Sequence, residues 1–253
     1  MARDTRKFLD GRTALVTGGA RRLGRTMASA LARAGATVVV HHHTSRDDAR
    51  ATAAGIEVLG GRAFLVDGDL ADPRAASALC RRAADVCAAP LDILVNNASV
   101  FAPGAAASTT AAAWDHAQAV NLRAPFLLAQ AFAAQLAGEG PADIVNLNDG
   151  RALRPGCDHF AYTVSKVGLH GLTRSLALAL APRVRVNELA LGAVLPPEVP
   201  AGGYQRTPRE ALPLRRYPSP DDVADALLFV LAAPALTGQT VHVDGGQHLQ
   251  PWS

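Results

Sequence analysis

Short apolar runs alternate with longer segments of helical periodicity along almost the whole chain. Runs rich in β-branched residues predict buried strands, and apolar residues that recur every three or four positions predict amphipathic helices. The predicted strands are residues 13–17, 37–40, 63–66, 91–96, 144–148, 184–189 and 240–243. The predicted helices are residues 25–34, 73–88, 114–136, 162–180 and 221–231. This alternation predicts an α/β fold, with a doubly wound, seven-stranded parallel sheet and helices on both faces.

One long segment, residues 195–220, lacks either period and is rich in proline and glycine. Irregular loops of more than about 20 residues are uncommon in compact domains and usually functional, so we expect this segment to be a substrate lid. No linker and no internal repeat divides the chain. We therefore expect one domain over residues 1–253.

Composition narrows the class of protein. The chain has 253 residues, 49% of them hydrophobic, which is enough for one substantial core. Its net charge of +3 comes from scattered arginines rather than from a basic run, so we expect no nucleic-acid partner. The three cysteines have no metal-binding spacing, which favours reduced thiols in the cytoplasm. Neither a signal peptide nor a membrane-spanning run is evident, so we expect no membrane partner.

A glycine-rich turn separates the first predicted strand from the first predicted helix. It contains Gly18, Gly19 and Gly24, with Arg22 where a middle glycine is common. Glycines allow close approach to a pyrophosphate, and the N–H groups at a helix start bind it. The turn does not match G-x-G-x-x-G, so taken alone it leaves an ordinary strand-to-helix turn open.

The end of the second predicted strand indicates which dinucleotide binds. An acidic residue usually stands there in NAD-binding proteins, where it accepts a hydrogen bond from the ribose. Here residues 41–45 read His-His-His-Thr-Ser, and the first carboxylate is Asp47. This pattern favours NADP(H), because Arg22, Ser45 and the histidines are donors for a 2′-phosphate. Neighbouring strand residues face opposite sides, so we expect no metal site in the histidine run.

Tyr162 and Lys166 stand four residues apart in a predicted helix, which places them on one face. A phenol has a pKa of about 10, and a neighbouring cation lowers it, as general acid–base catalysis requires. The spacing also arises by chance on solvated helices. The glycine turn, Asn97 and Asp149 all follow predicted strands, however, and ligands bind at the carboxyl ends of such strands. We therefore expect these residues to share one crevice.

Together these residues resemble the short-chain dehydrogenase/reductase family over residues 11–246, which implies a Rossmann-type sheet. Further matching motifs are Asp69-Leu70, Asn96-Asn97-Ala98 and the closing Val243-Asp244-Gly245-Gly246. The resemblance implies that Tyr162 and Lys166 are catalytic and that Asn121 holds a proton-relay water. With the residues of the preceding paragraphs, the predicted cofactor contacts are Gly18, Arg22, Leu23, Gly24, His41, His43, Thr44, Ser45, Asp69, Leu70, Asn97, Ala98, Ser99, Tyr162, Lys166 and Gly192.

Three positions depart from the usual family pattern: Arg22 replaces glycine, Asp149 replaces serine, and Leu191 precedes Gly192 in place of proline. The first two, with His41-x-His43 and residues 97–101, are similar to the pteridine reductase branch. That branch implies a pterin-like substrate stacked on Phe101. The implied substrate contacts are Arg22, Ser99, Phe101, Asp149 and Tyr162.

The chemistry of Asp149 leads to the same prediction. A serine hydroxyl donates to the alkoxide that forms from a carbonyl, whereas an ionised aspartate opposes that charge. A carboxylate instead suits C=N reduction, in which a ring nitrogen gains a proton. We therefore expect catalysis by Asp149, Tyr162, Lys166 and Asn121 in NADPH-dependent reduction of a pterin or dihydropterin.

Three alternatives stay open at this point. A carbonyl reductase acting on 3-oxoacyl or sugar substrates would use the same Tyr162 and Lys166. A non-catalytic NADP(H) sensor would need neither residue. Asp149 could also be a structural cap of the turn at Gly150. The resemblance further implies a homotetramer that pairs through the helices at residues 124–136 and 169–180.

Overall fold

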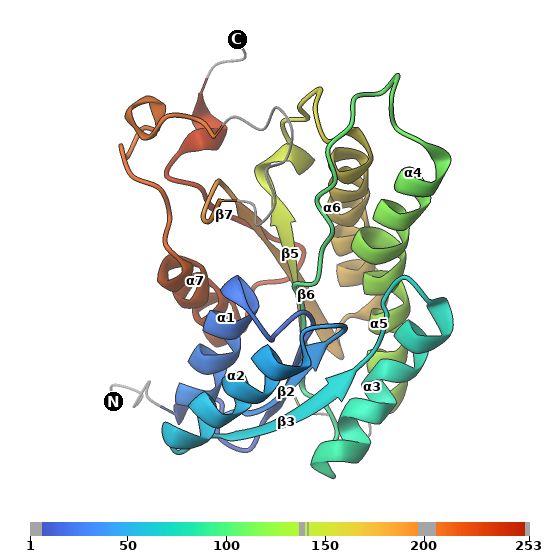
Figure 1. Cartoon of the computed structure of the whole chain (residues 1–253). Coiled ribbons are helices and arrows are strands. Elements are labelled where there is room, and N and C mark those ends of the chain that lie inside the picture. Colours follow the sequence, from blue (N-terminus) through green and yellow to red (C-terminus); the bar gives the residue numbers. More distant parts are fainter. Residues whose placement is uncertain (1–6, 137–139, 141, 197–205, 251–253) are drawn as a thin grey trace.

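The computed structural model describes residues 7–136, 140, 142–196 and 206–250 (Figure 1). Seven parallel strands form one sheet in the order β3-β2-β1-β4-β5-β6-β7. Their bounds are β1 Thr13–Val16, β2 Thr37–His42, β3 Arg62–Asp67, β4 Ile93–Asn96, β5 Ala142–Asp149, β6 Val184–Leu191 and β7 Thr240–Val243. The predicted doubly wound, seven-stranded sheet is therefore confirmed.

Helices cover both faces of this sheet. They are α1 Arg22–Arg33, α2 Arg46–Val58, α3 Pro73–Cys87, α4 Ala111–Gln118, α5 Ala124–Gln135, α6 Phe160–Leu180 and α7 Pro220–Ala232. Figure 1 shows α1, α2 and α7 on one side of the sheet and α3, α4, α5 and α6 on the other. Each face of the sheet packs against its helices to form a hydrophobic core. Because side chains alternate along a strand, Val38 and Val40 of β2 pack in the core on the side of α1 and α7, while Val39 packs in the core on the side of α3 and α5.

The helical elements differ from the sequence prediction at two places. The helix α2 was not predicted, because its buried residues are mostly small, with Ile56 the one large apolar side chain among them. The predicted helix 114–136 begins at Ala111 and is interrupted by a π-helical turn over Ala119–Arg123. Such turns occur often at functional sites, and this one carries Asn121.

The strand order places the crevice. Because β1 lies between β2 and β4, the chain leaves β1 and β4 toward opposite faces of the sheet, and a gap opens beyond their carboxyl ends. The loops after β1, β4 and β5 all meet there. The start of α6 follows closely after β5, so its first turns border the same gap.

The irregular segment at residues 195–220 is described only in part, since residues 197–205 lie outside the described ranges. Arg206 stacks over Tyr217, with 3.3 Å from its guanidinium carbon to the ring centroid. The Tyr217 hydroxyl donates to the Thr207 carbonyl oxygen at 2.8 Å. Thr207 lines the crevice. The described part is thus fixed beside the site, and a lid function stays a prediction.

Among the residues that the structure describes, no helix is both long enough and apolar enough to cross a membrane.

Candidate active site

A cavity of about 1080 Å³ opens at the carboxyl ends of the strands. It brings together nearly all of the residues that the sequence predicted. The predicted residues that line it are Gly18, Arg22, Leu23, Gly24, His41, His43, Thr44, Ser45, Asp69, Leu70, Asn97, Ala98, Ser99, Phe101, Asp149, Tyr162, Lys166 and Gly192. Asn121 is the predicted site residue that does not line it.

The glycine turn leaves an open space that side chains at Gly18 or Gly24 would fill. We call this space the glycine cradle. Gly18 has a φ of +60°, in the left-handed region that favours glycine. A Cβ on Gly24 would overlap the Gly18 carbonyl oxygen and lie 2.8 Å from the Asn97 side-chain nitrogen. The Asn97 amide also donates to the carbonyl oxygens of Thr17 and Gly18, at 2.9 and 3.1 Å. The turn is therefore held open at the start of α1, as a pyrophosphate site requires.

Arg22 adopts a left-handed backbone conformation, with a φ of 52°. This conformation explains why a glycine is common at that position, because a residue with a Cβ pays about 1 kcal/mol or more there. The Arg22 guanidinium donates to the Pro196 carbonyl oxygen at 2.5 Å. Arg22 therefore connects the glycine turn to the segment that follows β6.

His41 supports the glycine turn through both of its ring nitrogens. Nδ1 accepts from the Gly18 N–H at 3.1 Å, and Nε2 donates to the Gly68 carbonyl oxygen at 3.1 Å. Burial lowers the pKa of His41 to about 4, so the ring is neutral at physiological pH. With both ring nitrogens engaged, His41 has no N–H left to donate to a 2′-phosphate, which is the role that the sequence suggested for one or two of the histidines. The exposed residues His43 and Thr44 lie nearer to solvent, beside the start of α2.

Asp149 bonds both to Tyr162 and to the turn that follows β5. The Tyr162 hydroxyl donates to Oδ2 of Asp149 at 2.7 Å. Oδ1 accepts from the Arg151 N–H at 2.9 Å and caps the short 3-10 turn Gly150–Ala152. Asp149 can therefore both bond the Tyr162 hydroxyl and cap the turn at Gly150, because each contact uses a different oxygen of its carboxylate.

Lys166 lies on α6, one turn after Tyr162, and is 4% exposed. Its Nζ donates to the Leu147 carbonyl oxygen at 2.8 Å and lies 5.6 Å from the centroid of the Tyr162 ring. Burial lowers the pKa of Lys166 to about 8, and the carboxylates of Asp149 and Glu188 partly oppose that shift. The ammonium is therefore held in place, but is lost more easily than that of an exposed lysine.

Asn121 does not line the cavity but supports the loop that does. It lies in the π-helical turn and is 1% exposed. Its side chain accepts from the Val100 N–H at 2.9 Å and donates to the Val100 carbonyl oxygen and to the Ser165 hydroxyl, both at 3.0 Å. It also accepts from the Ser99 hydroxyl at 3.1 Å. These bonds fix the loop after β4 against α6. The contact between Asn121 and a proton-relay water stays a prediction.

A chain of contacts that the sequence did not reveal supports the aromatic wall of the cavity. Arg151 pairs through two nitrogens with the Asp158 carboxylate, which lowers the pKa of Asp158 to about 2. Asp158 in turn bonds His159 at 3.0 Å, and the His159 ring stacks on Phe101 with 3.9 Å between centroids. Phe101 meets Tyr162 edge-on at 4.7 Å. No spacing rule links these residues, because the irregular chain between β5 and α6 brings them together.

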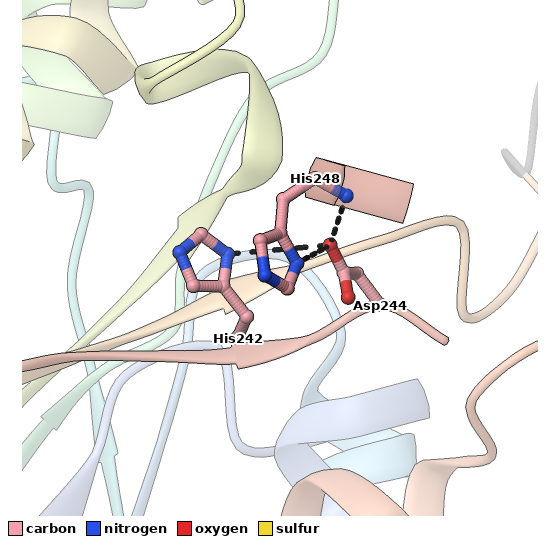
Figure 2. A group of neighbouring side chains, drawn as sticks. All are labelled: His242, Asp244 and His248. Atoms are coloured by element: carbon pink, nitrogen blue, oxygen red, sulfur yellow. Dashed lines mark hydrogen bonds and ion pairs between the residues drawn. The ribbon is translucent and has the colours of Figure 1, made fainter. Parts of the chain in front are cut away.

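Three further polar residues cluster at the end of β7 (Figure 2): His242 lies on that strand, Asp244 follows it, and His248 lies in the 3-10 turn Gln247–Leu249. Asp244 and His248 line the cavity. The rings of His242 and His248 stack, with 4.0 Å between centroids and 18° between planes. Asp244 accepts from His248 Nδ1 at 2.8 Å and from the N–H groups of Gly246 and His248. The Nδ1 atoms of both histidines face the same Asp244 carboxylate oxygen, His242 at 4.0 Å and His248 at 2.8 Å. The nitrogen and oxygen atoms of the three side chains thus lie within 4.8 Å of one another, beside the turn that follows β7.

The geometry agrees with comparisons to known proteins. A family model described as enoyl-(acyl carrier protein) reductase matches residues 18–248. The chain belongs to the short-chain dehydrogenase/reductase family. Pteridine reductase 1 of Leishmania tarentolae is 34% identical, with 93% of this chain and 96% of that protein covered. Galactitol 2-dehydrogenase of Rhizobium johnstonii is 37% identical, with 94% and 95% covered.

A solved structure of the same family is similar over nearly the whole chain. FolM alternative dihydrofolate reductase 1 from Brucella canis, complexed with NADP, has a TM-score of 0.89 and is 35% identical to this chain. The match covers 97% of each chain. The predicted membership of this family is therefore confirmed, and the chain is an oxidoreductase.

The glycine cradle generates the first prediction. We expect Gly24→Ala to raise the Kd for NADPH at least about tenfold, because the added Cβ overlaps the Gly18 carbonyl oxygen. Gly55→Ala is the matched control, since a Cβ there meets nothing within 4 Å. It lies inside α2, so it should leave Kd unchanged and raise the free energy of unfolding by about 0.5–1 kcal/mol. Fluorescence titration with NADPH measures both variants, and equal Kd values would contradict the cradle.

The pKa of Lys166 generates the second prediction. Because it lies near 8 rather than 10.5, the ammonium form is lost as the pH rises through about 8. We therefore expect kcat/KM to fall above about pH 8, since this parameter reports ionisations of the free enzyme. Initial rates of NADPH oxidation over a range of pH measure this limb. A kcat/KM that stays constant up to the ordinary lysine pKa of 10.5 would contradict the claim that burial lowers the pKa of Lys166.

Proposed function

We propose that this chain reduces a C=N bond of a pterin or dihydropterin with NADPH. The observation that carries the proposal is the bond between the Tyr162 hydroxyl and the Asp149 carboxylate, at 2.7 Å. In a carbonyl reductase the group at this place donates to a forming alkoxide, which an ionised carboxylate would oppose. A ring nitrogen that takes up a proton creates no such anion. The pair therefore suits protonation of nitrogen.

Two of the similar proteins support this substrate class. Their names are pteridine reductase 1 and FolM alternative dihydrofolate reductase 1. The galactitol 2-dehydrogenase relative is equally similar, however, so similarity alone does not select the substrate. The support comes from the site, because Phe101 provides an aromatic wall beside Tyr162. Flat heterocycles stack on such a wall.

NADP(H) is the cofactor that fits the residues present. The glycine cradle provides the pyrophosphate site, and no carboxylate stands among residues 41–45 at the end of β2. The nearby Asp67 pairs with Arg82 at 2.6 Å, which lowers the pKa of Asp67 and compensates its charge. The Brucella canis structure contains NADP. The reduced nicotinamide supplies the hydride, and the protein supplies position and proton transfer.

Tyr162, Asp149 and Lys166 each have a separate role in the proposed proton transfer. As the carbon of the C=N bond accepts hydride, the π-electron pair moves to nitrogen, and Tyr162 donates its hydroxyl proton there. Asp149, hydrogen-bonded to that hydroxyl, passes on a proton from water to restore the phenol. Lys166 favours the transient phenolate by its charge and, as the family resemblance implies, orients the ribose. Arg22, Ser99 and Phe101 hold the pterin.

A carbonyl reductase is the second candidate function. The curated relatives include a sugar-alcohol dehydrogenase, and Tyr162 and Lys166 serve carbonyl reduction equally well. A non-catalytic sensor is not favoured, because the catalytic tyrosine and lysine are both present and adjacent to each other.

We also propose that residues 195–220 act as a lid that closes over the substrate.

We further propose that the chain assembles as a homotetramer in the cytoplasm. Apolar side chains on the helices that would pair remain exposed in the single chain: Phe126 is 40% exposed on α5, and Leu178 is 84% exposed on α6. Burial of such side chains favours association. Light scattering of the purified protein measures the assembly.

The direct test of the proposed function is NADPH oxidation, followed by absorbance, with a panel of substrates. Dihydrobiopterin, dihydromonapterin and dihydrofolate represent C=N substrates, and an acetoacetyl thioester represents carbonyls. We expect turnover of at least one pterin and little or none of the thioester. Turnover of the thioester alone would replace the proposal by the second candidate.

The third prediction concerns the proton donor. Tyr162→Phe keeps the ring beside Phe101 but removes the hydroxyl that bonds Asp149. We expect kcat to fall by about 10²–10⁴-fold, the usual contribution of general acid catalysis, while the Kd for NADPH stays near its original value. Stopped-flow rates and fluorescence titration measure the two effects separately. Undiminished turnover would reject Tyr162 as the acid.

A further inference from the structure

The three polar residues at the end of β7 point metal-ligating atoms toward one place. We call His242, Asp244 and His248 the β7 cluster. The Nδ1 atom of each histidine faces Oδ2 of Asp244, at 4.0 Å for His242 and at 2.8 Å for His248 (Figure 2). One ligand atom from each side chain lies within 4.8 Å of the other two. Imidazole nitrogens and a carboxylate oxygen are ligands that Zn²⁺ and related transition metals take.

The separations between these atoms suit one ion after small side-chain rotations. Two ligand atoms of a tetrahedral zinc ion, each about 2.1 Å from the metal, lie about 3.4 Å from each other. The Nδ1–Oδ2 separations of 2.8 and 4.0 Å lie on either side of that value. The shorter one is a hydrogen bond whose proton the ion would replace, so it would lengthen while the longer one shortens. Rotation of the two stacked rings can supply both changes, so the backbone can stay in place.

His242 has a buried nitrogen that the described residues leave unpaired. Its Nδ1 is buried and has no hydrogen-bond partner among them. Most buried polar atoms are hydrogen-bonded, so an exception calls for an explanation, and a bound ion is one. The closest acceptor that this nitrogen faces is the Asp244 carboxylate, which is too far away for a hydrogen bond. A cation between the two groups would pair with both of them.

The surrounding structure holds the carboxylate in position. Asp244 is 4% exposed, and its Oδ1 accepts from the Gly246 N–H at 2.9 Å. Its Oδ2 accepts from the His248 N–H at 2.8 Å. The strand β7 is fixed as well, because the Thr240 hydroxyl donates to the buried Glu188 carboxylate on β6 at 2.7 Å. Hydrogen bonds that orient the ligands in this way raise the affinity of a metal site.

The cavity gives an ion access to the β7 cluster. Asp244 and His248 line it, so a coordination position that the protein leaves free faces the cavity and can take water. The turn after β7 also meets the loop after β6. The Gly192 N–H donates to the Val243 carbonyl oxygen at 3.0 Å, and a Cβ on Gly192 would lie 2.8 Å from the Asp244 Cα. An ion at the cluster would therefore fix the turn against one wall of the cavity.

We propose that the β7 cluster is a binding site for a divalent transition-metal ion such as Zn²⁺, held by His242 Nδ1, His248 Nδ1 and Asp244 Oδ2. The role of the ion is structural, since it joins the end of β7 to the turn that follows. The proposal rests on these three side chains and does not depend on which substrate is reduced.

The probe for this site is Zn²⁺ alone. The full chain, without a histidine tag and freed of metal by a chelator, is titrated with Zn²⁺ in a calorimeter. We expect one ion per chain, with a Kd of about 10 μM or lower. A ligand that binds the folded state stabilises it, so the melting temperature should rise by about 5 °C or more when free Zn²⁺ is at a hundredfold excess over Kd.

Two variants and a matched control locate the ion. His242→Phe keeps a ring stacked on His248 and removes a nitrogen that has no hydrogen-bond partner among the described residues. It should therefore fold normally and raise the Kd for Zn²⁺ at least about 100-fold, and His248→Gln should do the same. His116→Phe is the control, because it removes an exposed histidine of α4 outside the β7 cluster. Its Kd should stay within about twofold of wild type.

X-ray absorption at the zinc edge identifies the ligands in the wild type without any variant. We expect nitrogen and oxygen ligands at about 2.0–2.2 Å. A sulfur at about 2.3 Å would place the ion at the exposed Cys157 and overturn the proposal.

The titrations can also overturn it. Weakened binding in His242→Phe and His248→Gln, with His116→Phe unchanged, supports the proposal. Equal Kd values in His242→Phe and the wild type, or no saturable binding to the wild type below about 1 mM, would contradict it. The substrate panel tests the pterin proposal separately, so either proposal can fail alone.

Discussion

The hydrogen bond from the Tyr162 hydroxyl to the Asp149 carboxylate is the interaction on which the rest of the site depends. It forms because β5 ends at Asp149 and α6 begins at Phe160, so that the strand end and the first helical turn face one cavity. The chain between them is fixed by the Arg151–Asp158 ion pair and by the capping bond to Asp149. The same ion pair holds His159 against Phe101. The Tyr162 hydroxyl, the Asp149 carboxylate and the aromatic wall are thereby positioned as one unit.

This arrangement places several ionisable groups in a poorly hydrated region, and the protein balances them. His41 is neutral, because burial lowers its pKa to about 4. Lys166 keeps an ammonium, although burial lowers its pKa to about 8. Two carboxylates, Asp149 and Glu188, oppose that shift from different sides. The pKa of Lys166 is therefore set by buried groups as well as by those that line the cavity.

Much of this could be predicted from the sequence, because regular strands and short motifs have local signals. Each predicted strand matches a strand of the sheet, and the Tyr162–Lys166 spacing placed both side chains at the cavity. The helix α2 escaped prediction, since alanines gave its buried face no clear period. The contacts of Arg151 and Glu188 were also missed. They join residues from separate elements, and no spacing along the chain encodes such contacts.

The central claim is that a carboxylate at position 149 selects C=N reduction over carbonyl reduction. The most direct measurement is the ratio of kcat/KM for a dihydropterin to that for a 3-oxoacyl thioester, compared between the wild type and Asp149→Ser. The account predicts that the ratio falls by about 100-fold or more, because serine suits an alkoxide and cannot pass on a proton as a carboxylate does. An unchanged ratio would contradict the claim and reduce Asp149 to a cap of the turn that follows β5.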